Sequence, residues 1–200
     1  MTASPSRNET LIKETDDRHL DPLTGTLTRQ AFFQRLIGRT STANTSGRTF
    51  AVCLISADQF RNVNHKYGLE TGDAALIQVA LRVRLDLTVQ LGNEREFDLC
   101  RYDGTAFALL IPDSSLTEAA ETAESFRRAV RGTELQRDLR VTVSAGVAQY
   151  RLGESAEDAL SRAEQALQLA KQFGRDRVEI AESPDSHPDP ADVIPFDCSA

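Results

Sequence analysis

The sequence predicts an α/β fold in which a mixed central β-sheet is flanked by helices. Two observations support this class: short apolar runs of strand length alternate with amphipathic helical patterns, and one pair of runs is joined by a two-residue turn signal. The 200 residues, 40% of them hydrophobic, suit one globular domain with a tail. The longest apolar runs, such as 106–111, are far shorter than a membrane span requires. We therefore expect a protein without a membrane segment.

The first elements are expected in the N-terminal half. Residues 9–20 suit a short leading helix, and the β-prone run 49–56 has the length of a buried strand. Apolar residues then recur at three- and four-residue steps over 73–88, which predicts an amphipathic helix.

A β-hairpin follows. The runs 97–102 and 105–111 flank Asp103 and Gly104, a dipeptide favoured in two-residue turns because both positions tolerate positive φ. We expect Asp103 to act as a turn former.

The last elements alternate in the same way. Helical spacing predicts helices over 116–130 and 160–173, the second stopped by Gly174. Between them, strict alternation over 141–148 predicts a strand, and 177–180 suits a closing strand.

The charge of the chain is concentrated at its C-terminal end. Residues 181–200 contain five acidic residues, no Lys or Arg and four of the seven prolines, which is typical of a disordered tail. The tail carries −5 of the net charge of −7, which leaves 25 acidic against 23 basic residues elsewhere. We divide the chain into an N-terminal segment (1–20), a domain (21–180) and an acidic Pro-rich tail (181–200).

Composition also excludes some classes of protein. The nearly neutral domain lacks the basic surplus of a nucleic-acid binder. The polar N-terminus has no secretory signal, so we expect a cytoplasmic location. Cys53, Cys100 and Cys198 are odd in number and irregularly spaced, which indicates reduced cysteines without a disulfide framework or metal site.

Several separated motifs follow one another in order from 21 to 180. They are 21–29 (DPLTGTLTR), 56–64 (SADQFRNVN), 67–68 (YG), 72–73 (GD), 101–107 (RYDGTAF), 141–147 (VTVSAGV), 163–166 (AEQA), 170–171 (AK) and 174–178 (GRDRV). In this order they resemble the GGDEF family of bacterial diguanylate cyclases. In that family, two GTP-loaded domains join their substrates into cyclic di-GMP. The resemblance implies a nucleotidyl cyclase-like fold, with the hairpin at the family signature.

The resemblance also implies Mg²⁺ ions held by carboxylates at the end of the first strand and in the signature. This chain has Ser56 and Thr105 at those two positions, and Ala106 replaces another acidic signature residue. Neither hydroxyl replaces a negative charge. We therefore predict no catalytic residues and no cofactor, with Mg²⁺ relevant only to residual cyclase activity.

Two aspartates near these positions offer a displaced metal site. Asp58 lies two residues after Ser56 on the same strand face, and Asp103 occupies the first signature position. Because Mg²⁺ tolerates poor geometry badly, we favour a structural or solvated role for Asp58 and the turn role for Asp103.

Four residues match the nucleotide contacts of the family. Asn64 and Asp73 match the pair that hydrogen-bonds guanine, and Lys171 and Arg175 match phosphate contacts. Each has an alternative role: Asn64 suits a turn, Asp73 suits a helix N-terminus, and the two cations suit a helix C-terminus. Lys171 and Arg175 are one helical turn apart, so we expect them to point the same way.

A product-inhibition site is the last candidate. Arg95 and Asp98 have the Arg-x-x-Asp spacing of that element, but the gap from Asp98 to Arg101 is one residue shorter than in the family. The alternative is a strand-edge ion pair.

These observations lead to one main functional hypothesis and two alternatives. We expect a GGDEF-fold protein in cyclic di-GMP signalling without cyclase activity, which acts as a nucleotide-binding or protein-interaction module. The alternatives are a weak diguanylate cyclase that condenses two GTP molecules, and a partner-binding domain that recognises no nucleotide. The expected partners are GTP or cyclic di-GMP and a protein partner or second copy, with no nucleic acid and no membrane.

Overall fold

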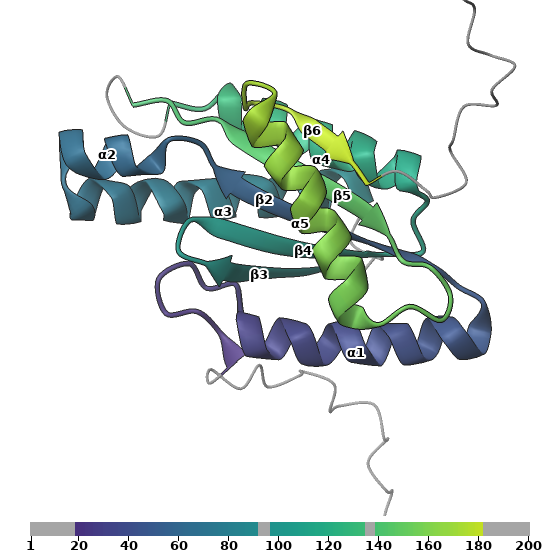
Figure 1. Cartoon of the computed structure of the whole chain (residues 1–200). Coiled ribbons are helices and arrows are strands. Elements are labelled where there is room, and N and C mark those ends of the chain that lie inside the picture. Colours follow the sequence, from purple (N-terminus) through teal and green to yellow (C-terminus); the bar gives the residue numbers. More distant parts are fainter. Residues whose placement is uncertain (1–18, 92–96, 135–138, 182–200) are drawn as a thin grey trace, which may run out of the picture.

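The computed structural model describes residues 19–91, 97–134 and 139–181, and the predicted leading helix and acidic tail lie outside these ranges almost entirely. The described residues form a six-stranded mixed sheet with the strand order β1-β3-β4-β2-β5-β6. Figure 1 shows α5 crossing one face of this sheet and α4 lying behind it. The predicted mixed sheet flanked by helices is confirmed.

The elements follow the chain in a regular alternation. The strands are β1 (Leu27–Thr28), β2 (Phe50–Ala57), β3 (Asp98–Asp103), β4 (Ala106–Pro112), β5 (Val143–Gln149) and β6 (Val178–Ile180). The helices are α1 (Arg29–Ser46), α2 (Phe60–Tyr67), α3 (Leu69–Leu91), α4 (Leu116–Arg131) and α5 (Ala156–Gln172). None of these helices has the length and apolar character that a membrane span requires.

Strand β2 forms the centre of the domain. It pairs antiparallel with both β4 and β5, and all of its residues are buried. Cys53 and Ile55 face a core shared with α3 and α4, whereas Val52 and Leu54 face a second core shared with α1 and α5. Burial on both faces explains why this strand is a continuous apolar run.

The buried cysteines follow the same pattern. Cys53 and Cys100 are both free and buried. Burial raises the pKa of the Cys53 thiol, and it raises that of Cys100 to about 12. Both residues are therefore unreactive core residues, as predicted.

Two helices were not predicted. Helix α1 begins at Thr28, whose side chain accepts a hydrogen bond from the Ala31 amide, and ends at Gly47 in the left-handed conformation. Helix α2 follows Gln59, which has a φ of 51°. Helix α1 precedes β2 in the chain, and helix α2 follows it.

The hairpin is present, but its turn is displaced by one residue. Asp103 pairs with Ala106, so Gly104 and Thr105 form the turn, and the register shifts between Arg101 and Asp103. The predicted turn position of Asp103 is therefore wrong, because an irregularity at Tyr102 adds one residue to β3.

Helix α5 packs closely on β5 through Gly146. A Cβ at this position would lie 2.2 Å from both the Ala163 carbonyl oxygen and the Leu167 amide nitrogen. The absence of a side chain therefore sets the distance between α5 and the sheet, and it fixes where the end of α5 lies relative to β2.

Candidate functional site

A cavity of about 440 Å³ lies at the end of β2, between the hairpin and the end of α5. Its lining residues come from β2, α2 and the connection between them, from the hairpin turn, and from α5 and the α5–β6 connection: Ser56, Ala57, Asp58, Gln59, Phe60, Arg61, Asn64, Thr105, Lys171 and Arg175. The cavity therefore contains Ser56, Asn64, Thr105, Lys171 and Arg175 from the sequence-based candidates, together with Asp58.

The β2 and hairpin sides of the cavity are joined through the backbone. Ser56 pairs with Ala106 across the sheet, and the Ala57 amide donates to the Thr105 carbonyl over 3.2 Å. This brings Ser56 and Thr105, the two residues at the metal positions of the family, to one wall of the cavity.

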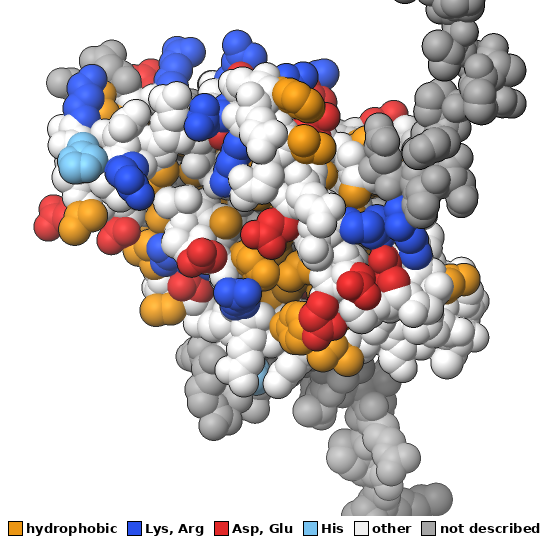
Figure 2. Space-filling view, viewed as in Figure 1, with side chains coloured by type: hydrophobic (Ala, Val, Ile, Leu, Met, Phe, Trp, Pro, Cys, Tyr) orange, Lys and Arg blue, Asp and Glu red, His pale blue; other side chains and the backbone are white. Residues whose placement is uncertain are grey.

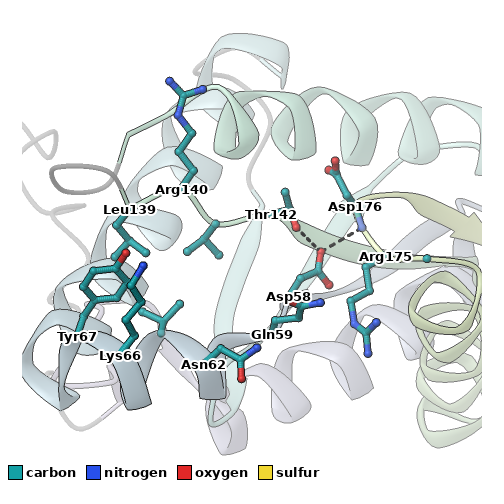
Figure 3. A pocket seen from close by; sticks show the side chains of 13 residues that line it. Asp58, Gln59, Asn62, Lys66, Tyr67, Leu139, Arg140, Thr142, Arg175 and Asp176 are labelled. Atoms are coloured by element: carbon teal, nitrogen blue, oxygen red, sulfur yellow. Dashed lines mark hydrogen bonds between the residues drawn. The ribbon is translucent and has the colours of Figure 1, made fainter.

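Asp58 also lines the cavity and is buried. The Thr142 hydroxyl donates to its carboxylate over 2.7 Å and the Asp176 amide over 3.1 Å (Figure 3), and the Ser144 hydroxyl donates over 2.7 Å. Its backbone amide also donates to the Thr142 carbonyl. Asp58 therefore joins β2 to β5 and to the connection after α5, as the structural interpretation of this residue proposed.

The connection after α5 is held in an uncommon backbone conformation. Arg175 and Asp176 have φ values of 66° and 47°, which non-glycine residues adopt infrequently. The Asp176 carboxylate forms ion pairs with Arg127 over 2.5 Å and with Arg131 over 3.0 Å. Together with the bond to Asp58, these ion pairs fix the Arg175 backbone beside the cavity.

Arg175 lines the cavity, but it does not share a helix with Lys171 as its spacing predicted. Helix α5 ends at Gln172, so Arg175 is not on the same helix as Lys171. Both nevertheless line the cavity. The expectation that they act on one site agrees with this geometry, but the helical spacing offered as the reason is wrong.

Of the two proposed guanine contacts, Asn64 lines the cavity and Asp73 does not. A Cβ at position 72 would lie 1.9 Å from Asn64 Oδ1, so the Asn64 side chain lies over Gly72, next to Asp73. Asp73 is exposed. Because α3 begins at Leu69, Asp73 is in its second turn, and the helix N-terminal alternative for this residue is wrong.

A second cavity of about 360 Å³ adjoins the first and shares Asp58, Gln59 and Arg175 with it. Lys66 and Arg140 also line it (Figure 3). Figure 2 shows Lys and Arg side chains gathered at the upper left, over the end of the molecule where α2 and the end of α5 lie. The surface around both cavities is therefore rich in cations.

The residues of the first cavity do not fit a Mg²⁺ site. Its only carboxylate is that of Asp58, which already accepts three hydrogen bonds. Across the described ranges, no group of three or more His, Cys, Asp and Glu residues is arranged to hold a metal ion. Asp103 is exposed in the hairpin and does not line the cavity. Arg61, Lys171 and Arg175 instead favour an anion.

Asp98, the inhibitory-site candidate that the described residues include, does not line this cavity. Asp98 is buried in β3 and forms an ion pair with Arg35 of α1. Arg95 lies outside the described residues. Sequence patterns did not reveal Arg35, which is 63 positions from Asp98 along the chain.

A mixed sheet with helices on both faces and a cation-lined cavity at the end of its central strand defines a nucleotidyl cyclase-like α/β domain. The family model "Diguanylate cyclase, GGDEF domain" matches residues 18–177. The chain belongs to the GGDEF domain family, and the resemblance seen in its motifs is confirmed.

Individual relatives agree with this assignment. The chain is 32% identical over 171 residues to diguanylate cyclase A of Treponema denticola, a match that covers 82% of this chain and 44% of the relative. It is 31% identical over 164 residues to diguanylate cyclase DgcP of Pseudomonas aeruginosa, which covers 80% of this chain and 24% of DgcP. The chain thus spans less than half the length of these two relatives.

Solved structures show the same fold. The coiled coil and GGDEF domain of DgcB from Caulobacter crescentus, in complex with c-di-GMP, matches with a TM-score of 0.76 and 30% identity, over 82% of this chain and 86% of the other. Diguanylate cyclase SiaD in complex with its activator SiaC, from Pseudomonas aeruginosa, matches with a TM-score of 0.75 and 30% identity, over 81% of this chain and 61% of the other.

Proposed function

We propose that this chain is a GTP-binding regulatory domain of cyclic di-GMP signalling that does not synthesise cyclic di-GMP. The observation that carries the proposal is the charge of the cavity at the end of β2. Three cations line it, and its single carboxylate is engaged in internal hydrogen bonds. Such a cavity suits a phosphate group but not the metal ions that phosphoryl transfer requires.

Guanine recognition is assigned to Asn64 and Asp73. An amide and a carboxylate supply the donor and acceptor that the guanine edge needs, and the Asn64 side chain lies over Gly72, the residue before Asp73. Lys171 and Arg175 then contact the phosphates from the other side of the cavity. Arg61 is a third phosphate contact that the sequence patterns did not suggest.

The absence of synthesis follows from Ser56 and Thr105. Both face the cavity where the family places carboxylates, and their hydroxyls carry no charge to hold Mg²⁺. As a nucleotide-binding domain, the chain would act on a partner: a protein or a second copy that recognises the GTP-bound form. Cyclic di-GMP is the alternative ligand of the same signalling class.

Titration calorimetry of the full chain with GTP tests the binding step. We expect a Kd on the order of 100 µM, because three cations at a half-open site offset only part of the triphosphate charge. Asn64→Ala and Lys171→Ala should each weaken binding about tenfold. Lys66→Ala, which removes a cation from the adjoining cavity, is the matched control and should leave the Kd within twofold.

The role of metal distinguishes this proposal from a weak cyclase. Removing Mg²⁺ with a chelator should leave GTP binding unchanged or tighten it, because no described carboxylate is free in the cavity to bind the ion. Incubation with GTP and Mg²⁺ should yield no cyclic di-GMP by chromatography. Measurable product, or no binding of GTP at millimolar concentration, contradicts the proposal.

A further inference from the structure

Helix α3 has apolar side chains on two opposite faces. Val79, Val83 and Leu87 are buried against the sheet. On the other side, Leu81, Leu85 and Val89 are 45%, 59% and 80% exposed and succeed one another at four-residue intervals, with half-buried Ile77 one turn before them. We call Ile77, Leu81, Leu85 and Val89 the outer stripe. A surface helix normally carries polar residues there, so the outer stripe has the character of a contact surface.

Arginines border the outer stripe on both sides. Arg82 follows Leu81 and Arg84 precedes Leu85, and both are exposed. Because successive residues turn by about 100° around a helix, these two side chains flank the stripe on opposite edges. Asp86 lies on the Arg82 side, where Ser125 donates to its carboxylate. The surface is therefore apolar in the middle and mainly cationic at its edges. It suits an occupant with apolar side chains flanked by acidic ones.

We propose that residues 192–197 of this chain's own acidic tail occupy the outer stripe. This segment reads Asp-Val-Ile-Pro-Phe-Asp, so three apolar side chains, Val193, Ile194 and Phe196, stand between two aspartates. The apolar residues match the stripe, and the aspartates match Arg82 and Arg84. No Lys or Arg occurs in residues 181–200 to oppose this pairing.

The path of the chain allows the contact. Ile180, the last residue of β6, lines the same surface cavity as Gln90 at the end of α3, so the tail leaves the domain near the Val89 end of the stripe. The thirteen residues from 181 to 193 span up to about 43 Å when extended. The stripe from Ile77 to Val89 is about 18 Å long. Pro195 favours an extended rather than helical segment at this surface.

Binding of this segment shields the exposed apolar side chains of the outer stripe from water. This role is independent of the proposed nucleotide binding, because the stripe and the cavity at the end of β2 share no residue.

Disulfide trapping in the full chain tests the proposal. Cys198 adjoins the segment, and the other two cysteines are buried, so a newly introduced surface thiol has Cys198 as its disulfide partner and reports on the tail alone. Val89→Cys and Leu81→Cys place that thiol at either end of the exposed stripe, so that both orientations of the tail are detected. Leu152→Cys, 62% exposed on the β5–α5 connection, is the matched control.

Under a mild copper–phenanthroline oxidant, we expect at least one stripe variant to form an intramolecular disulfide with Cys198 about tenfold faster than the control. Adding Ile194→Ser and Phe196→Ser should reduce that rate to the control's. Equal rates for the stripe variants and Leu152→Cys overturn the proposal. Disulfides between two copies through position 89 or 81 also overturn it, because they identify a second copy as the occupant.

Discussion

Ser56 and Ser144 lie directly opposite each other on β2 and β5, and both are buried, but they belong to different sides of the site. Ser144 donates to Asp58 in a network that fixes the α5–β6 connection. Ser56 lies at the cavity wall next to the hairpin, with Thr105. Asp58, the acidic residue that follows β2, thus accepts hydrogen bonds from β5 and the α5–β6 connection. Ser56 and Thr105, where the family resemblance implies metal carboxylates, are uncharged.

The largest expected effect comes from breaking the Asp58 side. Asp58→Ala leaves the buried Ser144 hydroxyl, the half-buried Thr142 hydroxyl and one amide without their acceptor, and we expect the free energy of unfolding to fall by about 2–4 kcal/mol in urea denaturation. Asp103→Ala removes an exposed carboxylate from the hairpin and should change it by less than about 0.5 kcal/mol. Equal effects of the two substitutions contradict a structural role for Asp58.

Ser144 and Ser56, which face each other across β5 and β2, test the same difference with smaller substitutions. Ser144→Ala removes one donor from the buried Asp58 carboxylate and should lower the free energy of unfolding by about 1–2 kcal/mol. Ser56→Ala, at the same depth in the sheet, should cost less than about 0.5 kcal/mol. The measurement is the same urea denaturation, and a larger loss for Ser56→Ala reverses the assignment of the two sides.

A smaller effect is expected from pH, through the ion pairs that extend the Asp58 network. Hydrogen bonding from Arg127 lowers the pKa of Glu124 below its usual value of 4.5, in opposition to burial. A lowered folded-state pKa stabilises the protein above the unfolded value, and this stabilisation is lost as the pH falls through the folded value. The urea midpoint should therefore be nearly constant from pH 7 to about pH 5.5 and fall below about pH 4.5.

Arg127→Gln is the control for this pH effect. It removes the ion pairs to Glu124 and Asp176, so stability at pH 7 should decrease and the further loss at low pH should become shallower. Asp21 also has a lowered pKa: burial opposes the shift, but hydrogen bonds from Thr24 and the charge of Arg101 outweigh it. It therefore maintains part of the pH dependence in both proteins. A variant whose pH profile parallels the parent contradicts a contribution from Glu124.

Local sequence patterns were enough to predict some helices and strands but not others. Strand β2 and the hairpin have strong β-type runs, and α3, α4 and α5 have regular apolar spacing. Helix α1 buries only Ala31, Phe32, Leu36 and Ala43, and the six residues between the last two include Gly38 and several Ser and Thr residues. Its apolar pattern is too sparse to identify a helix. Its cap at Thr28 and its packing in the second core stabilise it instead.

Residue type and local spacing are enough to predict the alternation of strands and helices and to identify the family motifs. They also reveal Ser56 and Thr105 at positions where the resemblance implies carboxylates. The hydrogen bonds of Asp58 and the place of Arg175 at the cavity, by contrast, depend on the tertiary structure. The partners of Asp58 are 84 to 118 residues away along the chain, and Arg175 enters the cavity through a left-handed turn after α5. Such contacts arise when the sheet assembles, and no local pattern encodes them.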